Sequence, residues 1–403
     1  MPPEVCNEMV LHCNMGNPSA SYKSAKRAQA LMDNFRREVA LLCGFSLADY
    51  YVIFTSGASE SNSMIISRVC DAYGATGATP HIVCSAIEHK SILENLKYYV
   101  DLGRATATYI NPTSAGQVLP SDVEAAIGPN TALVCVMTAN NETGAINDIK
   151  SIAAAAHRHN VPFYCDATQS FGKFSLKPNE MNVDAFGASF HKLYGPVGCG
   201  LLVIRRRWVE GYGIKSLIFG TQNEGLRGET ENIPAIAASR LALSINMRDR
   251  AAKNRRLGGL KQYIIDEIRA RAPCRTYTEY LGAQSNKEIE IVFFDDTWGR
   301  SASYLPNTIF LSIIKRSEPP MCNTKFKETL ACRGIIISVG SACNTSSAKA
   351  SHVLYALGAD QLIRNGALRI SLGDYNTKED CTAFVREFLT ILANCVKQNA
   401  FKK

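Results

Sequence analysis

Apolar runs of strand length alternate with amphipathic segments of helix length along the first part of the chain. Residues 23–44 repeat apolar side chains at steps of three and four, which is the period of a helix, and Gly44 is suited to end it. The run YYVIFT at 50–55 is typical of a buried strand. The same patterns predict further elements, namely strands at 81–85, 107–110, 132–138 and 163–166 and helices at 56–65, 89–100, 120–127 and 149–160. This alternation predicts a three-layer α/β/α domain with a mainly parallel sheet.

Polar clusters follow the ends of these predicted strands. They occupy residues 55–62, 86–90, 139–144, 166–169 and 189–192. Ligands of open parallel sheets bind beyond the carboxyl ends of the strands. We therefore expect these five segments to meet at one crevice.

The second part of the chain has a different pattern. Residues 232–272 are predicted to form a basic helix that leaves the first domain. Short strands and helices then mix, with strands at 289–294, 308–313 and 335–337 and helices at 321–333, 349–357 and 377–397. We expect a large domain over 17–250 and a smaller α+β domain formed by 1–16 and 251–403.

Composition narrows the class of protein. The chain has 403 residues, 46% hydrophobic and 20% charged, and its net charge of +8 comes from scattered basic residues that do not indicate nucleic-acid binding. No apolar run reaches roughly 18 residues, so no membrane span is expected, and the N-terminus has no signal-peptide pattern. The 14 cysteines include no C-x-x-C pair, which argues against a metal site or a disulfide scaffold and favours a reducing compartment such as the cytoplasm.

Lys192 lies in the segment SFHKLYGPVGCG at 189–200, with apolar residues on both sides. Such a setting would half-bury the ammonium and favour the neutral amine, which attacks carbonyl groups as a Schiff-base lysine does. The alternative is a loop lysine whose ammonium reaches water.

Two polar segments suit a phosphorylated pyridine ring. The segment TSGASE at 55–60 offers backbone amides and hydroxyls at a helix start, which suits a phosphate, although a plain capped turn has the same pattern. Asp166 ends an apolar strand, where a carboxylate can hold a pyridinium nitrogen protonated or can serve as a helix cap.

Four further residues carry candidate chemistry. His89 could stack on a flat ring, and the turn around Asn141 could donate amides to a ligand, although both also have ordinary structural explanations. Cys343 lies in the glycine- and serine-rich loop SVGSACNTSS at 338–347 and could carry a mobile thiolate, or it is one incidental cysteine among many. Arg369, on a short apolar strand, suits bidentate capture of a carboxylate.

Nine segments in a fixed order carry a family resemblance: GNPS (16–19), TSGASE (55–60), EHK (88–90), NNETG (140–144), DATQ (166–169), SFHKLYGP (189–196), LPNT (305–308), GSAC (340–343) and RISLG (369–373). Together they resemble the cysteine desulfurases, the NifS-like branch of fold-type I enzymes that depend on pyridoxal 5′-phosphate. The loop around Cys343 resembles the branch with a long catalytic loop.

The resemblance implies roles around the cofactor. Lys192 would form the Schiff-base link with pyridoxal phosphate and move protons, and His89 would stack on the ring. Asp166 would pair with the ring nitrogen and Gln169 with the phenolic oxygen. The remaining cofactor contacts would come from Ala58, Ser59, Asn141, Ser189 and His191, and from Thr230 of the neighbouring subunit of a homodimer.

The resemblance also implies the reaction. Asn141 and Arg369 would hold the carboxylate of L-cysteine, and Cys343 would take its sulfur as a persulfide while L-alanine leaves. The sulfur would pass to an acceptor such as an iron–sulfur scaffold protein, for cluster assembly or thiolation. Two alternatives stay open, a selenocysteine lyase or other β-eliminating enzyme and a catalytically reduced binding partner.

The chain departs from the family pattern in places. The family's opening segment before residue 16 is missing, residues 220–230 are a degraded version of a more glycine-rich stretch, and residues 293–303 resemble an insertion.

Overall fold

The structure is a computed structural model that describes residues 1–339 and 351–400. The chain divides into two compact units, each with a sheet and a hydrophobic core of its own. Unit 1 comprises Met1–Ile110, Val118–Thr138 and Asn147–Arg250. Unit 2 comprises Asn111–Gln117, Ala139–Ile146 and Ala251–Lys403.

The first 16 residues belong to unit 1 and not, as we expected, to the smaller domain. They contain helix α1 (Pro3–Leu11), which begins with a proline at a position that needs no N–H donor. Val5 of α1 is fully buried against Ala238 and Ala242 of α9 (Ile233–Met247). One buried valine gives too short an apolar pattern for periodicity to predict this packing.

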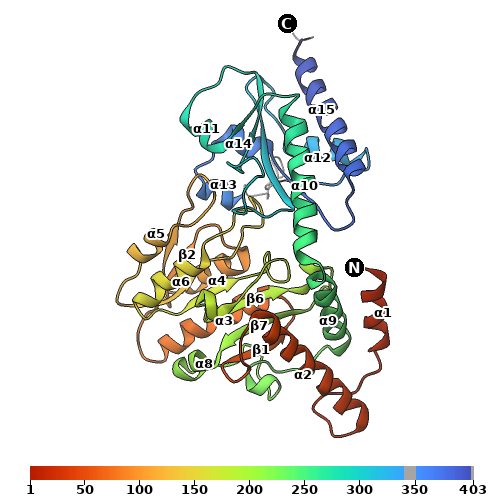
Figure 1. The fold of residues 1–403 in the computed structure, drawn as a ribbon. Coiled ribbons are helices and arrows are strands. Elements are labelled where there is room, and N and C mark those ends of the chain that lie inside the picture. Colours follow the sequence, from red (N-terminus) through yellow and green to blue (C-terminus); the bar gives the residue numbers. More distant parts are fainter. Residues whose placement is uncertain (340–350, 401–403) are drawn as a thin grey trace. The chain divides into compact units, whose positions relative to one another are not determined.

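Seven strands form the sheet of unit 1, in the order β1-β7-β6-β5-β4-β2-β3. They are β1 (Tyr50–Thr55), β2 (His81–Ser85), β3 (Thr106–Ile110), β4 (Thr131–Cys135), β5 (Phe163–Asp166), β6 (Ala185–Ser189) and β7 (Gly200–Arg205). Neighbouring strands pair in parallel except at β7, which is antiparallel to β1 and β6. The expected mainly parallel α/β architecture is confirmed (Figure 1).

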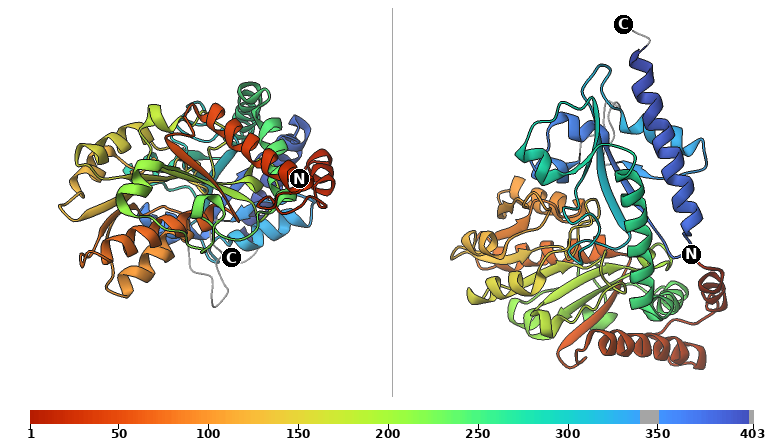
Figure 2. Two further views of the ribbon diagram at one scale, coloured as in Figure 1. Left: turned by 90° about the horizontal axis from the view of Figure 1, so that it is seen from below. Right: turned by 45° about the horizontal axis from the view of Figure 1, so that its top comes forward.

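Helices cover both faces of this sheet and give three layers (Figures 1 and 2). One face packs against α2 (Lys23–Cys43), α6 (Ile149–Arg158) and α9, and the other against α3 (Ala58–Gly74), α4 (Lys90–Asp101) and α8 (Arg206–Tyr212). The remaining helical segments of unit 1 are α5 (Pro120–Ala125), α7 (Pro178–Met181), η1 (Phe190–Leu193) and η2 (Asn223–Gly225). Alternate strand residues serve the two faces, so Leu201 packs with the first group and Leu202 with the second.

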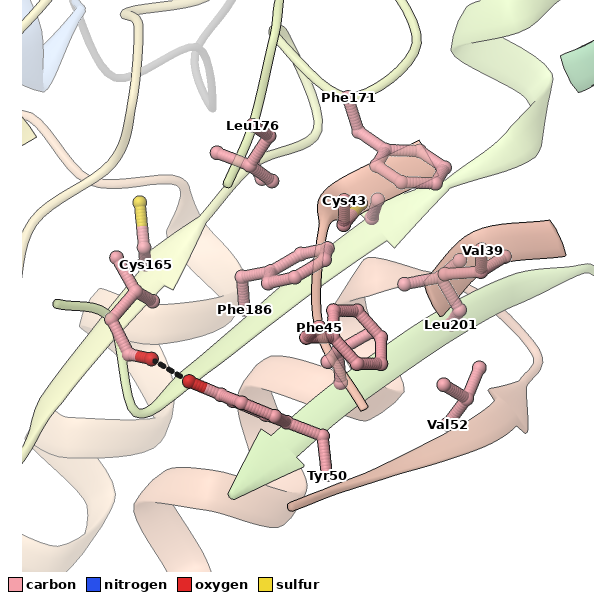
Figure 3. Packing of buried hydrophobic residues seen from close by; sticks show 14 of the residues in the cluster. Val39, Cys43, Phe45, Tyr50, Val52, Cys165, Phe171, Leu176, Phe186 and Leu201 are labelled. Atoms are coloured by element: carbon pink, nitrogen blue, oxygen red, sulfur yellow. Dashed lines mark hydrogen bonds between the residues drawn. The ribbon is translucent and has the colours of Figure 1, made fainter. Parts of the chain in front are cut away.

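The core beneath α2 fixes the position of β1. Phe35 of α2 stacks on Phe54 of β1 with ring centroids 5.3 Å apart, a contact that contributes roughly 0.5–1.5 kcal/mol beyond its buried area. Tyr50 is fully buried, and its hydroxyl donates to the Val183 carbonyl at 3.2 Å (Figure 3). These contacts hold both ends of β1, whose last residue leads into the candidate phosphate-binding turn.

Unit 2 is an α+β unit with a five-stranded sheet in the order β11-β12-β10-β9-β8. Its strands are β8 (Cys274–Thr276), β9 (Ile289–Phe293), β10 (Thr308–Lys315), β11 (Ser338–Val339) and β12 (Ala367–Ser371). Its helices are α10 (Arg250–Arg269), α11 (Tyr277–Gly282), α12 (Asn323–Ala331), α13 (His352–Ala356), α14 (Gln361–Gly366) and α15 (Lys378–Ala400). Helices α10, α12 and α15 pack on one face of the sheet (Figure 2). Among the described helices, none combines the length and the apolarity that a membrane crossing requires.

Two expected elements of the second part were wrong in detail. The single helix expected over 232–272 is interrupted after α9, because Asp249 has a positive φ of 54° and cannot continue a right-handed helix. The strand expected at 335–337 begins instead at Ser338, since Ile336 is 90% exposed and does not pair with the sheet.

A buried ion pair stabilises unit 2. Lys261 of α10 is 2% exposed, and its Nζ lies 2.7 Å from Asp295 Oδ2 and 3.3 Å from the Leu305 carbonyl oxygen. Burial lowers the pKa of Lys261, and the Asp295 carboxylate partly opposes this effect. The pair anchors the segment 295–305, which includes most of the presumed insertion, to α10.

Removing one partner of this pair is expected to destabilise the protein strongly. Lys261→Met would leave the Asp295 carboxylate buried without its cation and lower the unfolding free energy by about 3–5 kcal/mol. Urea unfolding of Lys261→Met and of the double variant Lys261→Met/Asp295→Asn measures the effect. The double variant should recover most of the loss, and a loss below about 1 kcal/mol in the single variant would contradict the expectation.

Candidate active site

The first group of expected site residues lies where β1 and β6 end. β1 ends at Thr55, and the turn after it leads into α3. The Ala58 N–H, at the start of α3, donates to Ser189 Oγ at 2.7 Å, and Ser189 is the last residue of β6. A helix start with backbone N–H donors beside a hydroxyl is a suitable site for phosphate oxygens. Two of the expected phosphate ligands therefore lie together in unit 1.

A glycine in β7 permits this close approach. Gly200 pairs with Thr55 on one side and with Ser189 on the other. A Cβ at this position would lie 2.5 Å from Gly57 Cα and 2.6 Å from the Ala188 carbonyl oxygen. Any side chain at 200 would therefore displace the turn between β1 and α3.

An ion pair that the sequence analysis did not find holds the segment 218–230 against the same turn. Arg227 Nε lies 3.0 Å from Glu60 Oε1, with the two side chains 16% and 9% exposed. Burial raises the pKa of Glu60, but bonds from Arg227 and from the Ser56 N–H outweigh this effect and hold it below its ordinary value. Thr230, the expected contact to a neighbouring subunit, is exposed at the end of this segment.

Asp166 is the last residue of β5 and is 5% exposed. Its Oδ1 accepts from the Thr168 N–H at 2.9 Å, and its Oδ2 accepts from Asn62 Nδ2 at 3.0 Å. Both of these donors are neutral groups. They hold the carboxylate in place without cancelling its charge, which suits a cationic ligand group.

His89 follows β2 and is the N-cap residue of α4. Its ring is exposed, whereas the preceding Glu88 is fully buried. Glu88 Oε1 accepts from Ser85 Oγ at 2.6 Å and from the Met137 N–H at 2.7 Å. These bonds tie the turn that carries His89 to the segment after β4. An acidic residue at the end of the apolar run AIE is the feature of the sequence that could have indicated this buried contact. Glu88 is assigned no role in the sequence analysis.

Burial raises the pKa of Glu88 to about 8, against the lowering effect of its two hydrogen bonds. An unfolded glutamate ionises near pH 4.3, so between about pH 4.5 and 8 only the unfolded chain loses the proton. The wild type should therefore lose stability as the pH rises through this window.

Glu88→Gln keeps an oxygen acceptor and removes the titration. Relative to wild type, its unfolding free energy should improve by up to about 1.4 kcal/mol per pH unit across that window. Chemical denaturation at pH 5, 6.5 and 8 tests this, and parallel pH profiles for the two proteins would contradict it.

The structure corrects the expected burial of Lys192. The residue lies in the short turn η1, where Phe190 and Leu193 are buried and His191 and Lys192 are exposed in the chain alone. The apolar side chains of the neighbouring strands β6 and β7 pack into the core of the sheet and do not bury the Lys192 side chain. Partial desolvation of its ring by the surrounding turn and the nearby Lys192 charge lower the pKa of His191.

In unit 2, Arg369 of β12 contacts the loop that carries Asn141. Its Nη1 donates to the Asn141 carbonyl oxygen at 2.7 Å, and its Nη2 donates to Ser338 Oγ at 3.3 Å. Its Nε is buried and has no hydrogen-bond partner among the described residues. The forked guanidinium thus has a donor left for a carboxylate. The two residues expected to hold the substrate carboxylate are adjacent within unit 2.

The same loop is connected to the beginning of α13. Ser351, which is 2% exposed, donates from Oγ to Glu142 Oε2 at 2.6 Å and caps α13 by accepting from the Leu354 N–H at 3.3 Å. Linear spacing gives no signal for this contact, because 209 positions separate its two residues.

Of the other expected residues, Ser59 is exposed in the first turn of α3 and Gln169 is half-buried after β5. Cys343 lies outside the described residues. Within the described part of the chain, no group of three or more His, Cys, Asp or Glu side chains is arranged to hold a metal ion.

Comparison with known proteins shows the family of the chain. The aminotransferase class-V family model matches residues 1–384. The cysteine desulfurase IscS of Clostridium botulinum is 32% identical over 399 residues, which cover 98% of this chain and 91% of the relative. IscS of Dictyoglomus turgidum is 32% identical over 367 residues, covering 91% of this chain and 84% of the relative.

Solved structures give the same result. A NifS-like protein has a TM-score of 0.80 at 28% identity, with 98% of this chain and 96% of that chain covered. A structure described as SspA in complex with cysteine has a TM-score of 0.71 at 28% identity and covers 94% of this chain and 97% of its own. The chain therefore belongs to the class-V aminotransferase family and, within it, to the cysteine desulfurases, which are pyridoxal-phosphate-dependent enzymes.

Proposed function

We propose that this protein is an L-cysteine desulfurase that converts L-cysteine to L-alanine and captures the sulfur as a persulfide on Cys343. The observation that carries the proposal is the buried Asp166 carboxylate, which neutral donors hold at the end of β5 in the same unit as the Ala58–Ser189 corner. The relatives named cysteine desulfurase and the structure of SspA with cysteine support the choice of substrate.

The residues of unit 1 fit pyridoxal phosphate. The Ala58 N–H and Ser189 Oγ would bind the phosphate, and Asp166 would pair with the ring nitrogen. Thr168 Oγ1, two residues beyond Asp166, is buried and has no hydrogen-bond partner among the described residues. A buried hydroxyl without a partner is costly, so a polar ligand group beside it is favoured. When bound, the cofactor supplies an electron-withdrawing ring that stabilises negative charge at the substrate Cα.

We assign the chemistry of the chain as follows. Lys192 would hold the cofactor covalently through Nζ and then move a proton at the substrate Cα. Asp166 would keep the proton on the ring nitrogen, and Arg369 with Asn141 would orient the substrate carboxylate. The Cys343 thiolate attacks the substrate sulfur, so that an S–S bond forms while the Cβ–S bond breaks. The electron pair of the broken bond goes to Cβ, which takes a proton, and alanine leaves.

We further propose a homodimer in which Thr230 reaches the phosphate of the neighbouring subunit, and an acceptor protein that takes the persulfide sulfur. The exposure of Thr230 at the end of the segment that Arg227 anchors supports the first point. An iron–sulfur scaffold is the proposed acceptor, with a thiolation partner as the other possibility.

The decisive experiment supplies the purified protein with pyridoxal phosphate, L-cysteine and dithiothreitol and measures sulfide and alanine together. Equal amounts of both products support the proposal. Turnover of L-selenocysteine with L-cysteine left intact would assign a selenocysteine lyase. A protein that gains no visible cofactor absorbance even with added cofactor would be the catalytically reduced binding partner.

A further inference from the structure

Asn62 is a fully buried amide near the start of α3 that joins two of the expected catalytic side chains. Its Nδ2 donates both to Asp166 Oδ2 at 3.0 Å and to Ser91 Oγ at 2.8 Å. Its Oδ1 accepts from the hydroxyl of Tyr164, also fully buried, at 2.5 Å. The carboxylate can only accept, so the NH₂ side of the amide must face Asp166. Three partners therefore leave Asn62 with one orientation.

The second end of this chain of hydrogen bonds is His89. The Ser91 N–H donates to His89 Nδ1 at 3.2 Å, and Ser91 Oγ lies 2.8 Å from the same nitrogen. A backbone N–H cannot accept, so His89 Nδ1 must be the acceptor. Ser91 Oγ accepts from the Asn62 NH₂ group and is free to donate its own proton to His89 Nδ1.

We propose that Asn62 is a positioning residue that orients Asp166 and, through Ser91, holds His89 as the neutral tautomer with its proton on Nε2. The inference rests on the roles proposed above for His89 and Asp166. Every bond in the chain then has one direction, from Tyr164 through Asn62 to Asp166 and through Ser91 to His89.

The network determines which ring nitrogen can serve the reaction. A proton on His89 Nδ1 would face the Ser91 N–H and would reverse the bond from Ser91 Oγ. Nε2 is therefore the nitrogen through which His89 donates to a ligand, and the neutral ring acts there as a donor. Removing Asn62 would release Ser91 Oγ, so that the Ser91 N–H alone would hold Nδ1 unprotonated and the preference for one tautomer would weaken.

The test reads the tautomer directly in protein prepared without cofactor or substrate. Selective ¹⁵N labelling of the seven histidines allows ring-nitrogen NMR, and His89→Gln assigns the resonances of His89. We expect a protonated Nε2 and an unprotonated Nδ1 in the wild type. A protonated Nδ1 would overturn the inference, even if every Asn62 variant failed to fold.

Two variants and a control extend the test. Asn62→Asp has the same shape but presents a carboxylate to Asp166, and Asn62→Ala removes all three bonds. Both should show a weaker preference for the tautomer protonated on Nε2, weaken cofactor binding and lower kcat by roughly 10–100-fold with a smaller change in KM. Asn95→Ala is the matched control, because Asn95 accepts from Ser67 at 3.5 Å in another contact between α3 and α4.

The outcomes separate this inference from the proposed function. A folded Asn62→Asp protein with the wild-type tautomer and wild-type cofactor affinity would refute the positioning role. An active desulfurase with Nδ1 protonated refutes only the inference. A wild-type protein with the expected tautomer but no sulfide release leaves the network intact and refutes only the function.

Discussion

Lys192→Ala is expected to lower kcat/KM for L-cysteine by about 10³-fold or more. The variant loses the amine that we propose bonds to the cofactor and moves the substrate proton, and each of these roles would account for a large part of the rate. The substitution does not change the proposed phosphate site formed by Ala58 and Ser189 or the carboxylate of Asp166. We therefore expect the variant to bind the cofactor without a covalent link.

Borohydride reduction followed by peptide mass spectrometry measures this difference. The wild type should retain the reduced cofactor on the peptide that contains Lys192, and the variant should release it on denaturation. Lys177→Ala is the control, because Lys177 is a partly exposed lysine of unit 1 that pairs with the exposed Glu180 at 2.7 Å. A Lys192→Ala protein with more than a tenth of wild-type activity would rule out the assigned role.

Cys343→Ser is expected to reduce sulfide release to background and to leave cofactor binding unchanged. A serine oxygen is a weak nucleophile at neutral pH and cannot form the persulfide, whereas Lys192, Asp166 and the phosphate site proposed at Ala58 and Ser189 belong to unit 1. In single-turnover reactions without reductant, the wild type should gain one sulfur atom on the peptide that contains Cys343. The variant should gain none.

Cys332→Ser is the matched control for this prediction. Cys332 is an exposed free cysteine of the same unit at the end of α12, so its loss should change neither products nor rate. Sulfide release from Cys343→Ser at the wild-type rate would remove the persulfide from the mechanism and favour direct β-elimination.

Much of unit 1 could be predicted because its strands are buried on both faces. Such strands appear as short continuous apolar runs, and β1 and β5 were predicted with the bounds that the structure has. Prediction failed where the pattern was short or interrupted. α1 buries one valine, and the break between α9 and α10 comes from the positive φ of Asp249, which a helical period does not report.

The candidate site was predicted unevenly. Motif order located Lys192, Asp166 and Arg369, but apolar neighbours suggested a burial of Lys192 that the turn η1 does not provide. Apolar neighbours in the sequence do not by themselves bury a residue, because the exposure of a side chain depends on which face of its helix, turn or strand it occupies.

The sequence by itself determined the family, the alternation of strands and helices, and the residues that carry the proposed chemistry, because each is encoded in local pattern and motif order. Only the tertiary structure decided which side chains support them. Asn62 and Asp166 are 104 positions apart and Glu88 and Met137 are 49 apart, yet each pair is within 3.0 Å. Hydrogen bonds of this kind form where parallel strands end side by side. They cannot be predicted from the linear spacing of the residues that they join.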